Sequence, residues 1–405
     1  LEVTGKVDIK KVTDYIFERQ ENIRKHENAD WLKQQGIDMV LGKASFSGKN
    51  EIEVNGKKYS CKKIIIATGS KPKKLKVPGI ENVKYYDNES IFNINELPEK
   101  LLVIGGGPIG IEIAQAMSRL GSKLTVIQHG DRILEHDDKM LTDILLKQLQ
   151  KEGIQFILNA EIEKFSSAKS ATLKSKGNQS QEIEFDAVFV GIGRELGLES
   201  LQLKNAGIEV ENHNIVKDKY LKTTNKNVFV CGDVAGDLMF SHAAEFHGRI
   251  LLNNLFSPFK KKLNNDHMSW AIFTDPQLAT FGLNEKQLKE RTISYTKLEQ
   301  SFKDDDRAVT DNYQYAKMIL YLSKGGLFKK EKILGGSMVA PNAGELIQDL
   351  LLANTSNLSI NAIFNKIYPY PVASRINQQI IANYKEKSLT KTVKKLLQTT
   401  FKIFS

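Results

Sequence analysis

The hydrophobic residues of this 405-residue chain are grouped in short runs, and several of these runs end at glycine or at Thr-Gly. Their shortness and their valine and isoleucine content are typical of buried parallel strands. The runs lie at 64–67, 101–104, 186–190 and 228–231. The second run leads into apolar residues at helical spacing over 109–120, which Gly121 ends. A strand at 123–128, an amphipathic helix at 140–149 and a strand at 154–158 follow, and this alternation predicts a doubly wound α/β sheet.

Other stretches of the chain have a different pattern. Residues 42–59 alternate between polar and apolar positions around Asn55-Gly56, which predicts a β-hairpin. A polar stretch at 9–26 predicts a helix. Beyond a connector rich in lysine and asparagine at 259–266, strand runs mix with helical patterns, which predicts a separate α+β domain. Its strands are expected at 317–322 and 333–339, and its helices at 344–353 and 373–384.

The composition excludes several classes of protein and of site. Apolar residues make up 41% and charged residues 26% of the chain, as in globular rather than disordered proteins. No apolar run approaches the length of a membrane span. The net charge is +10, but the sequence contains no recognisable nucleic-acid-binding module. The two cysteines, Cys61 and Cys231, are far apart, and the seven histidines lack ligand spacing, so we expect neither a disulfide framework nor a metal site. This cysteine usage fits a reducing, cytoplasmic setting.

A glycine-rich sequence after the second run carries the clearest chemical signal. Gly105, Gly107 and Gly110 match the G-x-G-x-x-G pattern, directly after a predicted strand and at the start of a predicted helix. The first glycine allows a tight turn, the second lets a diphosphate approach the backbone, and the third lets helix and strand pack closely. Pro108 and Ile109 begin the helix, whose N–H groups and dipole hold phosphate. The sequence therefore predicts a site for the diphosphate of a nicotinamide dinucleotide.

The end of the next predicted strand bears on which dinucleotide is bound. An acidic residue there binds the ribose 2′-hydroxyl of NAD, and a nearby arginine accommodates the 2′-phosphate of NADP. This chain has Gln128 and His129, followed by Arg132. Gln128 can bond to a hydroxyl group and would not repel a phosphate, so the choice between NAD and NADP stays open.

Two other strand ends predict a second dinucleotide site. The run at 64–67 is followed by Thr68-Gly69, and the run at 228–231 is followed by Gly232-Asp233. Each glycine lets the backbone approach a ligand closely at a strand end. Together with the hairpin at Asn55-Gly56, this is the organisation of a second dinucleotide-binding unit.

Taken in order, these motifs resemble those of the flavoprotein disulfide reductases, the family of dihydrolipoamide dehydrogenase, glutathione reductase and mercuric reductase. The resemblance extends from residue 1 to about residue 385. The matching segments are Gly42-Lys43-Ala44-Ser45-Phe46, Ala67-Thr68-Gly69-Ser70, the glycine-rich sequence with Glu112, Gly191-Ile192-Gly193-Arg194, Gly232-Asp233, and Phe273-Thr274-Asp275-Pro276, which opens the family's dimerisation domain. The resemblance implies an α/β fold with two Rossmann-like domains, which bind FAD and NAD(P), and a C-terminal α+β dimerisation domain.

The resemblance also implies cofactors and residue roles. It implies FAD, with contacts at Lys43, Ala44, Thr68, Gly69, Gly232, Asp233, Ser241 and His242. It implies NAD or NADP, with Glu112 beside the nicotinamide and with Gly193 and Arg194 as further contacts. Hydride would pass from NAD(P)H through FAD to a small-molecule or thiol/disulfide acceptor, in a homodimer.

Two departures from the family pattern leave the acceptor open. The family begins with its own strand, G-x-G-x-x-G turn and helix for FAD, followed by a Cys-x4-Cys pair, and none of these is present. We therefore expect an incomplete enzyme whose first FAD-binding segment is missing. Where the family has an acid–base histidine and its carboxylate, this chain has Tyr370 and Arg375, and a tyrosine with a pKa of about 10 is a poor proton shuttle at neutral pH.

Tyr370 and Glu112 are the remaining catalytic candidates. One alternative is an NAD(P)H oxidase or quinone reductase without a redox disulfide, and another is a redox-dead nucleotide-binding protein.

The expected domains follow from this assignment. An incomplete FAD-binding domain is expected over 1–98 and 218–262, an NAD(P)-binding domain over 99–217 and the dimerisation domain over 263–385. The tail at 386–405 is basic and has apolar residues near helical spacing, namely Leu389, Val393, Leu396, Leu397, Phe401 and Phe404. For this tail we favour a helix packed on the dimerisation domain, or a partly ordered end, over an anchor on a membrane surface.

Overall fold

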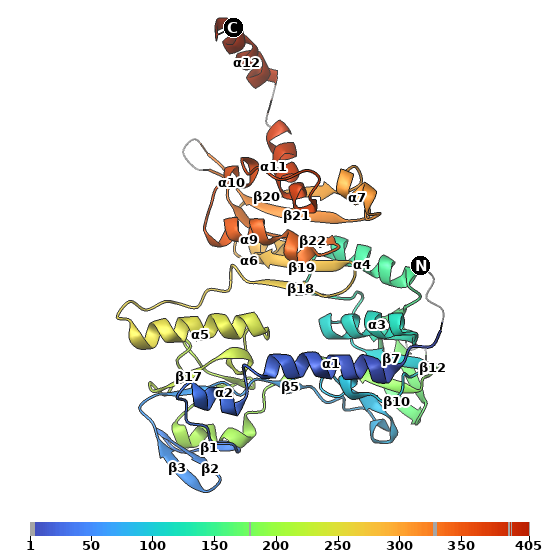
Figure 1. Ribbon diagram of the computed structural model, residues 1–405, viewed down its shortest axis with the longest axis vertical. Helices are drawn as coiled ribbons and strands as arrows, with labels where there is room; N and C mark the ends of the chain where they lie inside the picture. Colours follow the sequence, from blue (N-terminus) through green and yellow to red (C-terminus); the bar gives the residue numbers. More distant parts are fainter. Residues whose placement is uncertain (1–4, 178–179, 327–329, 388, 390, 405) are drawn as a thin grey trace. The chain divides into compact units, whose positions relative to one another are not determined.

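The computed structural model describes residues 5–177, 180–326, 330–387, 389 and 391–404 (Figure 1). These residues form two compact units. The first unit runs to His129 and includes Gln155–Asn264, and the second comprises Gly130–Ile154 and the chain from Asn265 onward. Within the described ranges, no helix has the length and apolar character that crossing a bilayer requires. The same ranges hold no cluster of three His, Cys, Asp or Glu side chains suited to a metal ion.

A five-stranded parallel sheet forms the centre of the first unit. Its strands, in spatial order, are β6 (Tyr85–Tyr86), β13 (Ala187–Val190), β7 (Lys100–Ile104), β8 (Lys123–Gln128) and β9 (Gln155–Leu158). β13 is buried along its whole length and β7 is buried beyond its first residue, as expected of strands covered on both faces. The helix α3 (Pro108–Leu120) connects β7 to β8 and packs on β8.

Smaller sheets complete the first unit. β4 (Ile64–Ile66) pairs in parallel with β17 (Val228–Val230). The antiparallel sheets are β1 (Ala44–Gly48), β2 (Glu51–Val54) and β3 (Lys57–Ser60); β10 (Ala160–Ser167), β11 (Ser170–Ser175) and β12 (Ser180–Glu184); β5 (Lys71–Pro72) with β14 (Arg194–Glu195); and β15 (Val210–Glu211) with β16 (Asn214–Ile215). The remaining helices are α1 (Ile9–Arg24), α2 (Ala29–Gln34) and α5 (Ser241–Phe256). The predicted hairpin at Asn55-Gly56 joins β2 to β3.

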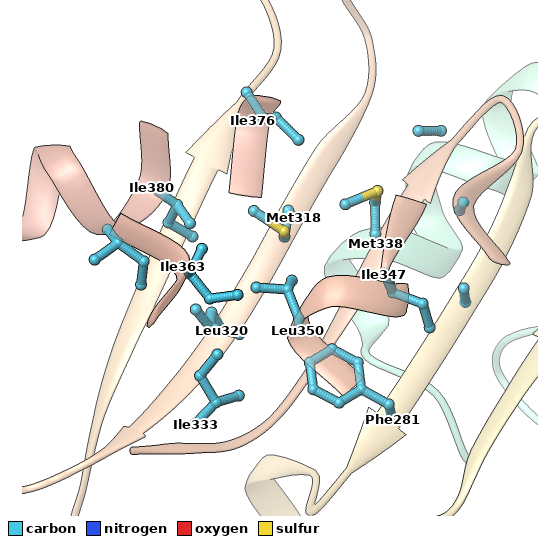
Figure 2. Packing of buried hydrophobic residues seen from close by; sticks show 14 of the residues in the cluster. Phe281, Met318, Leu320, Ile333, Met338, Ile347, Leu350, Ile363, Ile376 and Ile380 are labelled. Carbon is cyan, nitrogen blue, oxygen red and sulfur yellow. The ribbon is translucent and has the colours of Figure 1, made fainter. Parts of the chain in front are cut away.

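The second unit is built on a five-stranded antiparallel sheet. Its strands, in spatial order, are β18 (Ser269–Ile272), β19 (Gln277–Gly282), β22 (Ile333–Ala340), β21 (Lys317–Ser323) and β20 (Tyr295–Ser301). Its helices are α4 (Lys139–Lys151), α6 (Glu285–Glu290), α7 (Asp306–Thr310), α8 (Ala343–Leu346), α9 (Gln348–Thr355), α10 (Asn361–Phe364), α11 (Ile376–Lys387) and α12 (Lys391–Phe404). Figure 2 shows the core, in which Ile347 and Leu350 face Met318 and Met338 of the sheet.

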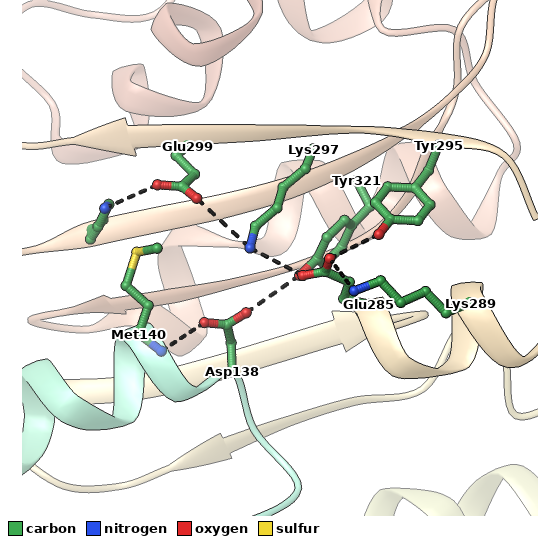
Figure 3. A network of polar contacts seen from close by, with 9 residues as sticks. Asp138, Met140, Glu285, Lys289, Tyr295, Lys297, Glu299 and Tyr321 are labelled. Carbon is green, nitrogen blue, oxygen red and sulfur yellow. Dashed lines mark hydrogen bonds and ion pairs between the residues drawn. The ribbon is translucent and has the colours of Figure 1, made fainter.

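A polar network ties four elements of the second unit together (Figure 3). Asp138 caps α4 through the N–H of Met140, and the Tyr321 hydroxyl of β21 donates to the same carboxylate. Glu285, the first residue of α6, is bonded to Tyr295 and Lys297 of β20. The network holds α4, α6, β20 and β21 together.

The predicted α/β fold with Rossmann-like domains and a C-terminal α+β domain is confirmed. Some elements differ from the predictions. The helix expected at 344–353 is two helices, α8 and α9, joined at Ile347. The sheet of β10, β11 and β12 was not predicted. The division into FAD- and NAD(P)-binding domains stays a prediction.

Candidate functional site

The turn between β7 and α3 is packed tightly on one side and open on the other. Gly105 has a φ of +111°, and a Cβ there would collide with the carbonyl oxygen of Gly191 at the end of β13. A Cβ at Gly110 would collide with the carbonyl oxygen of Gly105. In contrast, nothing lies within 4 Å of the position a Cβ would take at Gly107, and Pro108 beside it is exposed. The open side of the turn can therefore admit a ligand without rearrangement.

Two long helices of the first unit begin without a side-chain cap. The N-cap residues are Gly107 for α3 and Phe240 for α5, and neither provides a capping hydrogen bond. By comparison, α1 and α4 are capped by Asp8 and Asp138. The first N–H groups of a helix have no partner within it and carry the positive end of its dipole. The starts of α3 and α5 are therefore suited to hold an anion.

Gln128 lies at the end of β8, where we expected a ribose contact. Its side chain is buried, and its Oε1 accepts a hydrogen bond of 2.8 Å from the N–H of Gly106. The amide thus fastens the glycine-rich turn to the end of β8. His129, the next residue, is exposed. The ribose role of Gln128 and His129, and the choice between NAD and NADP, stay predictions.

Arg194 connects the end of the parallel sheet to the end of β4. Its Nε donates to Ser70 Oγ at 2.5 Å and its Nη2 donates to the Ser70 carbonyl oxygen at 2.8 Å. Ser70 Oγ donates in turn to Asp233 Oδ2 at 2.5 Å, and that oxygen lies 3.6 Å from Arg194 Nε. Because Arg194 follows β13 closely and Ser70 follows β4, the two predicted nucleotide sites are joined by these bonds. The sequence pointed to Arg194 as a cofactor contact, but it did not reveal this connection.

The predicted FAD contacts at the strand ends lie together. Thr68 and Gly69 follow β4, Gly232 and Asp233 follow β17, and the two strands are paired in parallel. Thr68 is exposed, whereas Gly232 is buried. The structure thus gathers four of the expected residues at one edge.

The other predicted FAD contacts lie on different elements. Ser241 and His242 form the first turn of α5 and are exposed, and the His242 ring stacks on Phe240 with centroids 5.2 Å apart. Lys43 and Ala44 are exposed at the start of β1, in the separate sheet of β1, β2 and β3.

His247 is a residue that our sequence reasoning missed. It is fully buried on α5, and its Nδ1 accepts a hydrogen bond of 3.2 Å from the N–H of Gly232. Burial lowers the pKa of His247, while the charge of Asp237 acts in the opposite direction and Lys217 adds to the lowering. The His247 Nε2 and the Asp237 Oδ2 are both buried without a hydrogen-bond partner among the described residues. In the sequence we considered the histidines only as possible metal ligands, and no local pattern distinguished His247.

The catalytic candidates lie in different units. Glu112 is half-buried in α3, four residues after Pro108. Tyr370 belongs to the second unit, where its hydroxyl donates to Asp306 Oδ2 at 3.0 Å and Arg375 lies 5.7 Å from its ring centre. The bond to Asp306 raises the pKa of Tyr370, which moves the phenol further from titration at neutral pH.

Gly193 and Arg194 come shortly after β13, with Gly191 and Ile192 between, and Arg194 begins β14. Gly193 is exposed, and its carbonyl oxygen accepts a hydrogen bond from the N–H of Lys73. The cofactor roles of these two residues, of Glu112 and of Tyr370 stay predictions.

Comparison with known proteins extends the sequence resemblance. A family model described as pyridine nucleotide-disulphide oxidoreductase matches residues 3–248, and one described as the dimerisation domain of that family matches residues 268–380. The chain is 29% identical to mercuric reductase of Staphylococcus aureus over 91% of this chain and 67% of that protein. It is 32% identical to dihydrolipoyl dehydrogenase of Mycoplasma pneumoniae over 87% of this chain and 76% of that protein.

The solved structures that are similar to this chain include the HOCl-induced flavoprotein disulfide reductase RclA from Escherichia coli. It superposes with a TM-score of 0.81 at 26% identity, over 92% of this chain and 85% of that chain. A further relative, mercuric reductase of Bacillus cereus, is 29% identical, and the chain spans 57% of its length.

Proposed function

Because this chain belongs to the pyridine nucleotide-disulphide oxidoreductase family, we propose that it passes hydride from NAD(P)H through FAD to a disulfide-type or related acceptor. Enzymes of this family use FAD and NAD(P)H. The observation that carries the proposal is the open turn at Gly107, at the uncapped start of α3, together with the bonds by which Arg194, a few residues after β13, reaches the ends of β4 and β17.

The nucleotide side of the proposal rests on α3 and its turn. The N–H groups at the start of α3 hold the diphosphate of NAD(P)H, and the missing side chain at Gly107 lets the diphosphate reach them. Gln128 keeps the turn in place through its bond to Gly106. Glu112, on the same helix, is proposed to lie near the nicotinamide.

The flavin side rests on the ends of β4 and β17. The residues there fit a flavin dinucleotide, because exposed Thr68 and the backbone of Gly69 adjoin Asp233, a carboxylate that can bond a hydroxyl group of the cofactor. Arg194 and Ser70 hold that carboxylate in position. The uncapped start of α5 supplies positive dipole at the site. When bound, FAD accepts hydride from the nicotinamide and passes the electrons on.

A quinone or another acceptor that needs no redox disulfide is the second candidate. Tyr370 favours it, because a phenol whose pKa is raised by Asp306 is a poor acid–base group for thiol exchange at neutral pH. Electron transfer to a quinone in place of a disulfide needs no thiolate leaving group, so it places a smaller demand on this residue.

The test measures NAD(P)H binding by the full chain through the change in nucleotide fluorescence. We expect Gly107→Ala to weaken binding about tenfold or more, since its methyl group occupies the space for the diphosphate. The matched control is Gly248→Ala in α5, where nothing lies within 4 Å of the added Cβ either. Neither variant should lower the thermal midpoint, and Gly248→Ala should raise it slightly because alanine favours the helix interior more than glycine does. If Gly107→Ala binds as tightly as the wild type, the proposed site is wrong.

Turnover with FAD and two acceptors separates the candidate functions. NAD(P)H oxidation with a small cyclic disulfide supports the disulfide reductase. Oxidation with a benzoquinone but not with the disulfide supports the second candidate. Binding of neither nucleotide by the wild-type chain would contradict both.

A further inference from the structure

The last helix, α12, separates its charged residues from its apolar residues. The segment 391–404 contains four lysines and no acidic residue. Its lysines are at 391, 394, 395 and 402, and its apolar residues are at 393, 396, 397, 401, 403 and 404. With 3.6 residues per turn, the lysine positions fall on one side of the helix and the apolar positions on the other. The sequence of α12 is therefore that of an amphipathic helix whose charged residues are all basic.

Among the residues that the structure describes, large apolar side chains of α12 are left exposed. Leu397 is 53% exposed, Phe401 is 73% exposed and Phe404 is 85% exposed. Ile403 is exposed as well. The packing on the dimerisation domain that we favoured from the sequence is thus not seen for these side chains, and the side chain of Leu396 lies outside the described residues. An exposed apolar surface with a polar border marks a binding surface.

We propose that α12 binds the surface of an anionic lipid bilayer, with its lysines at the phosphate headgroups and its apolar side chains at the acyl boundary. Charge complementarity decides the partner, because every charge on α12 is positive and the preceding Lys385-Glu386-Lys387 is also net positive. A second copy packed apolar side to apolar side would leave both basic faces without a partner, and an apolar groove on a protein would likewise use only one side of the helix. A bilayer with anionic headgroups satisfies both sides at once.

Flotation of the full chain with lipid vesicles tests this proposal. We expect binding to vesicles of phosphatidylcholine mixed with phosphatidylglycerol, no binding to phosphatidylcholine alone, and weaker binding at high salt. The double variant Leu397→Gln/Phe401→Gln should abolish binding without lowering the thermal midpoint, since both side chains are already exposed.

A charge-matched pair of variants separates α12 from net charge. Lys394→Gln/Lys395→Gln should weaken binding about fivefold for each lysine removed. Lys147→Gln/Lys151→Gln changes the net charge equally at exposed positions of α4 and should have little effect.

Several results would overturn the proposal. They are no flotation with the anionic vesicles, an equal loss in both lysine pairs, and unchanged binding by Leu397→Gln/Phe401→Gln. A self-association in solution that this last variant removes, in the absence of vesicle binding, would assign the apolar side to a second copy and would also contradict it.

Discussion

At the level of single residues, the buried ring of His247 holds the backbone just before Asp233. The N–H of Gly232 donates to its Nδ1, and this bond requires an unprotonated nitrogen. Burial, the largest influence, lowers the pKa of His247, although Asp237 opposes the shift. The unfolded chain therefore takes up the proton more readily than the folded chain. The neutral ring of His247 contributes its full share of the stability above the unfolded pKa of about 6.5. That contribution is lost as the pH falls through the lowered pKa of the folded chain.

We expect two substitutions of His247 to differ in their pH dependence. His247→Asn keeps an acceptor oxygen near the Gly232 N–H but does not titrate, so its free energy of unfolding should change less between about pH 7.5 and about pH 5.5 than that of the wild type. His247→Leu leaves the buried N–H without a partner and should cost about 1–3 kcal/mol at about pH 7.5. The cost should be smaller at about pH 5.5, because the wild type has lost part of its own stability there and leucine does not titrate. Urea unfolding measures all three proteins. The account fails if His247→Asn retains the wild-type slope.

The residues that could be predicted from sequence are those whose role depends on local geometry. Gly105 and Gly110 were identified because a strand-to-helix turn around a diphosphate leaves no room for a Cβ at these positions. Gln128 was assigned to the ribose, yet its Oε1 accepts a bond from Gly106, 22 residues earlier in the chain. His247 gave no signal, because its burial depends on how α5 packs against the end of β17. Contacts of this kind follow from tertiary packing and are not visible in a local pattern.

At the level of elements, prediction succeeded where apolar runs were continuous and ended at glycine. β8 has the predicted bounds, and β7 and β13 differ from the predicted runs by one residue at their first ends. The strands β10, β11 and β12 have polar residues on their exposed face and no continuous apolar run, so they gave a weak signal. α4 was expected as a helix, but its packing against β22 in the second unit could not be read from its amphipathic pattern.

The start of α6 is held by a carboxylate with an unusually low pKa. Lys289, bonded to Glu285 at 2.8 Å, contributes most to lowering the pKa of Glu285 to about 2, and Tyr295 and Lys297 add to the effect (Figure 3). Because this folded pKa lies below the ordinary value of 4.5, the carboxylate stabilises the second unit above about pH 4.5. That contribution is lost as the pH falls through about 2.

We expect Glu285→Gln to lower the free energy of unfolding at neutral pH by about 1–2 kcal/mol, a range reduced because the side chain is partly exposed. The loss of stability between pH 4.5 and about 2 should be smaller in this variant than in the wild type. Glu290→Gln, at the exposed end of the same helix, removes only a loose pair with Lys286 and should change little. Thermal unfolding across acid pH compares the three, and equal acid profiles would refute the role of Glu285.

At the level of the whole molecule, the second unit presents apolar side chains in the region that matches a dimerisation domain. The match covers residues 268–380, and within it Ile367 is 92% exposed, while Leu352 and Tyr370 are also exposed. Large apolar side chains left in water by a single chain are typical of surfaces that a partner covers. The dimerisation domain supports a homodimer, and these side chains are our candidates for its contact surface.

We expect light scattering on the purified chain to give twice the 45.6 kDa mass of one chain. Ile367→Asp should reduce this mass to that of one chain, because a charge in the covered surface has no partner and must be desolvated. Its effect on the stability of the single chain should be small, since Ile367 is already exposed there.

Ile23→Asp, at an exposed position of α1, is the control and should leave the dimer intact. A monomeric wild type, or a dimeric Ile367→Asp variant, would contradict this surface. If the variant is monomeric and still binds NAD(P)H, nucleotide binding belongs to one chain alone.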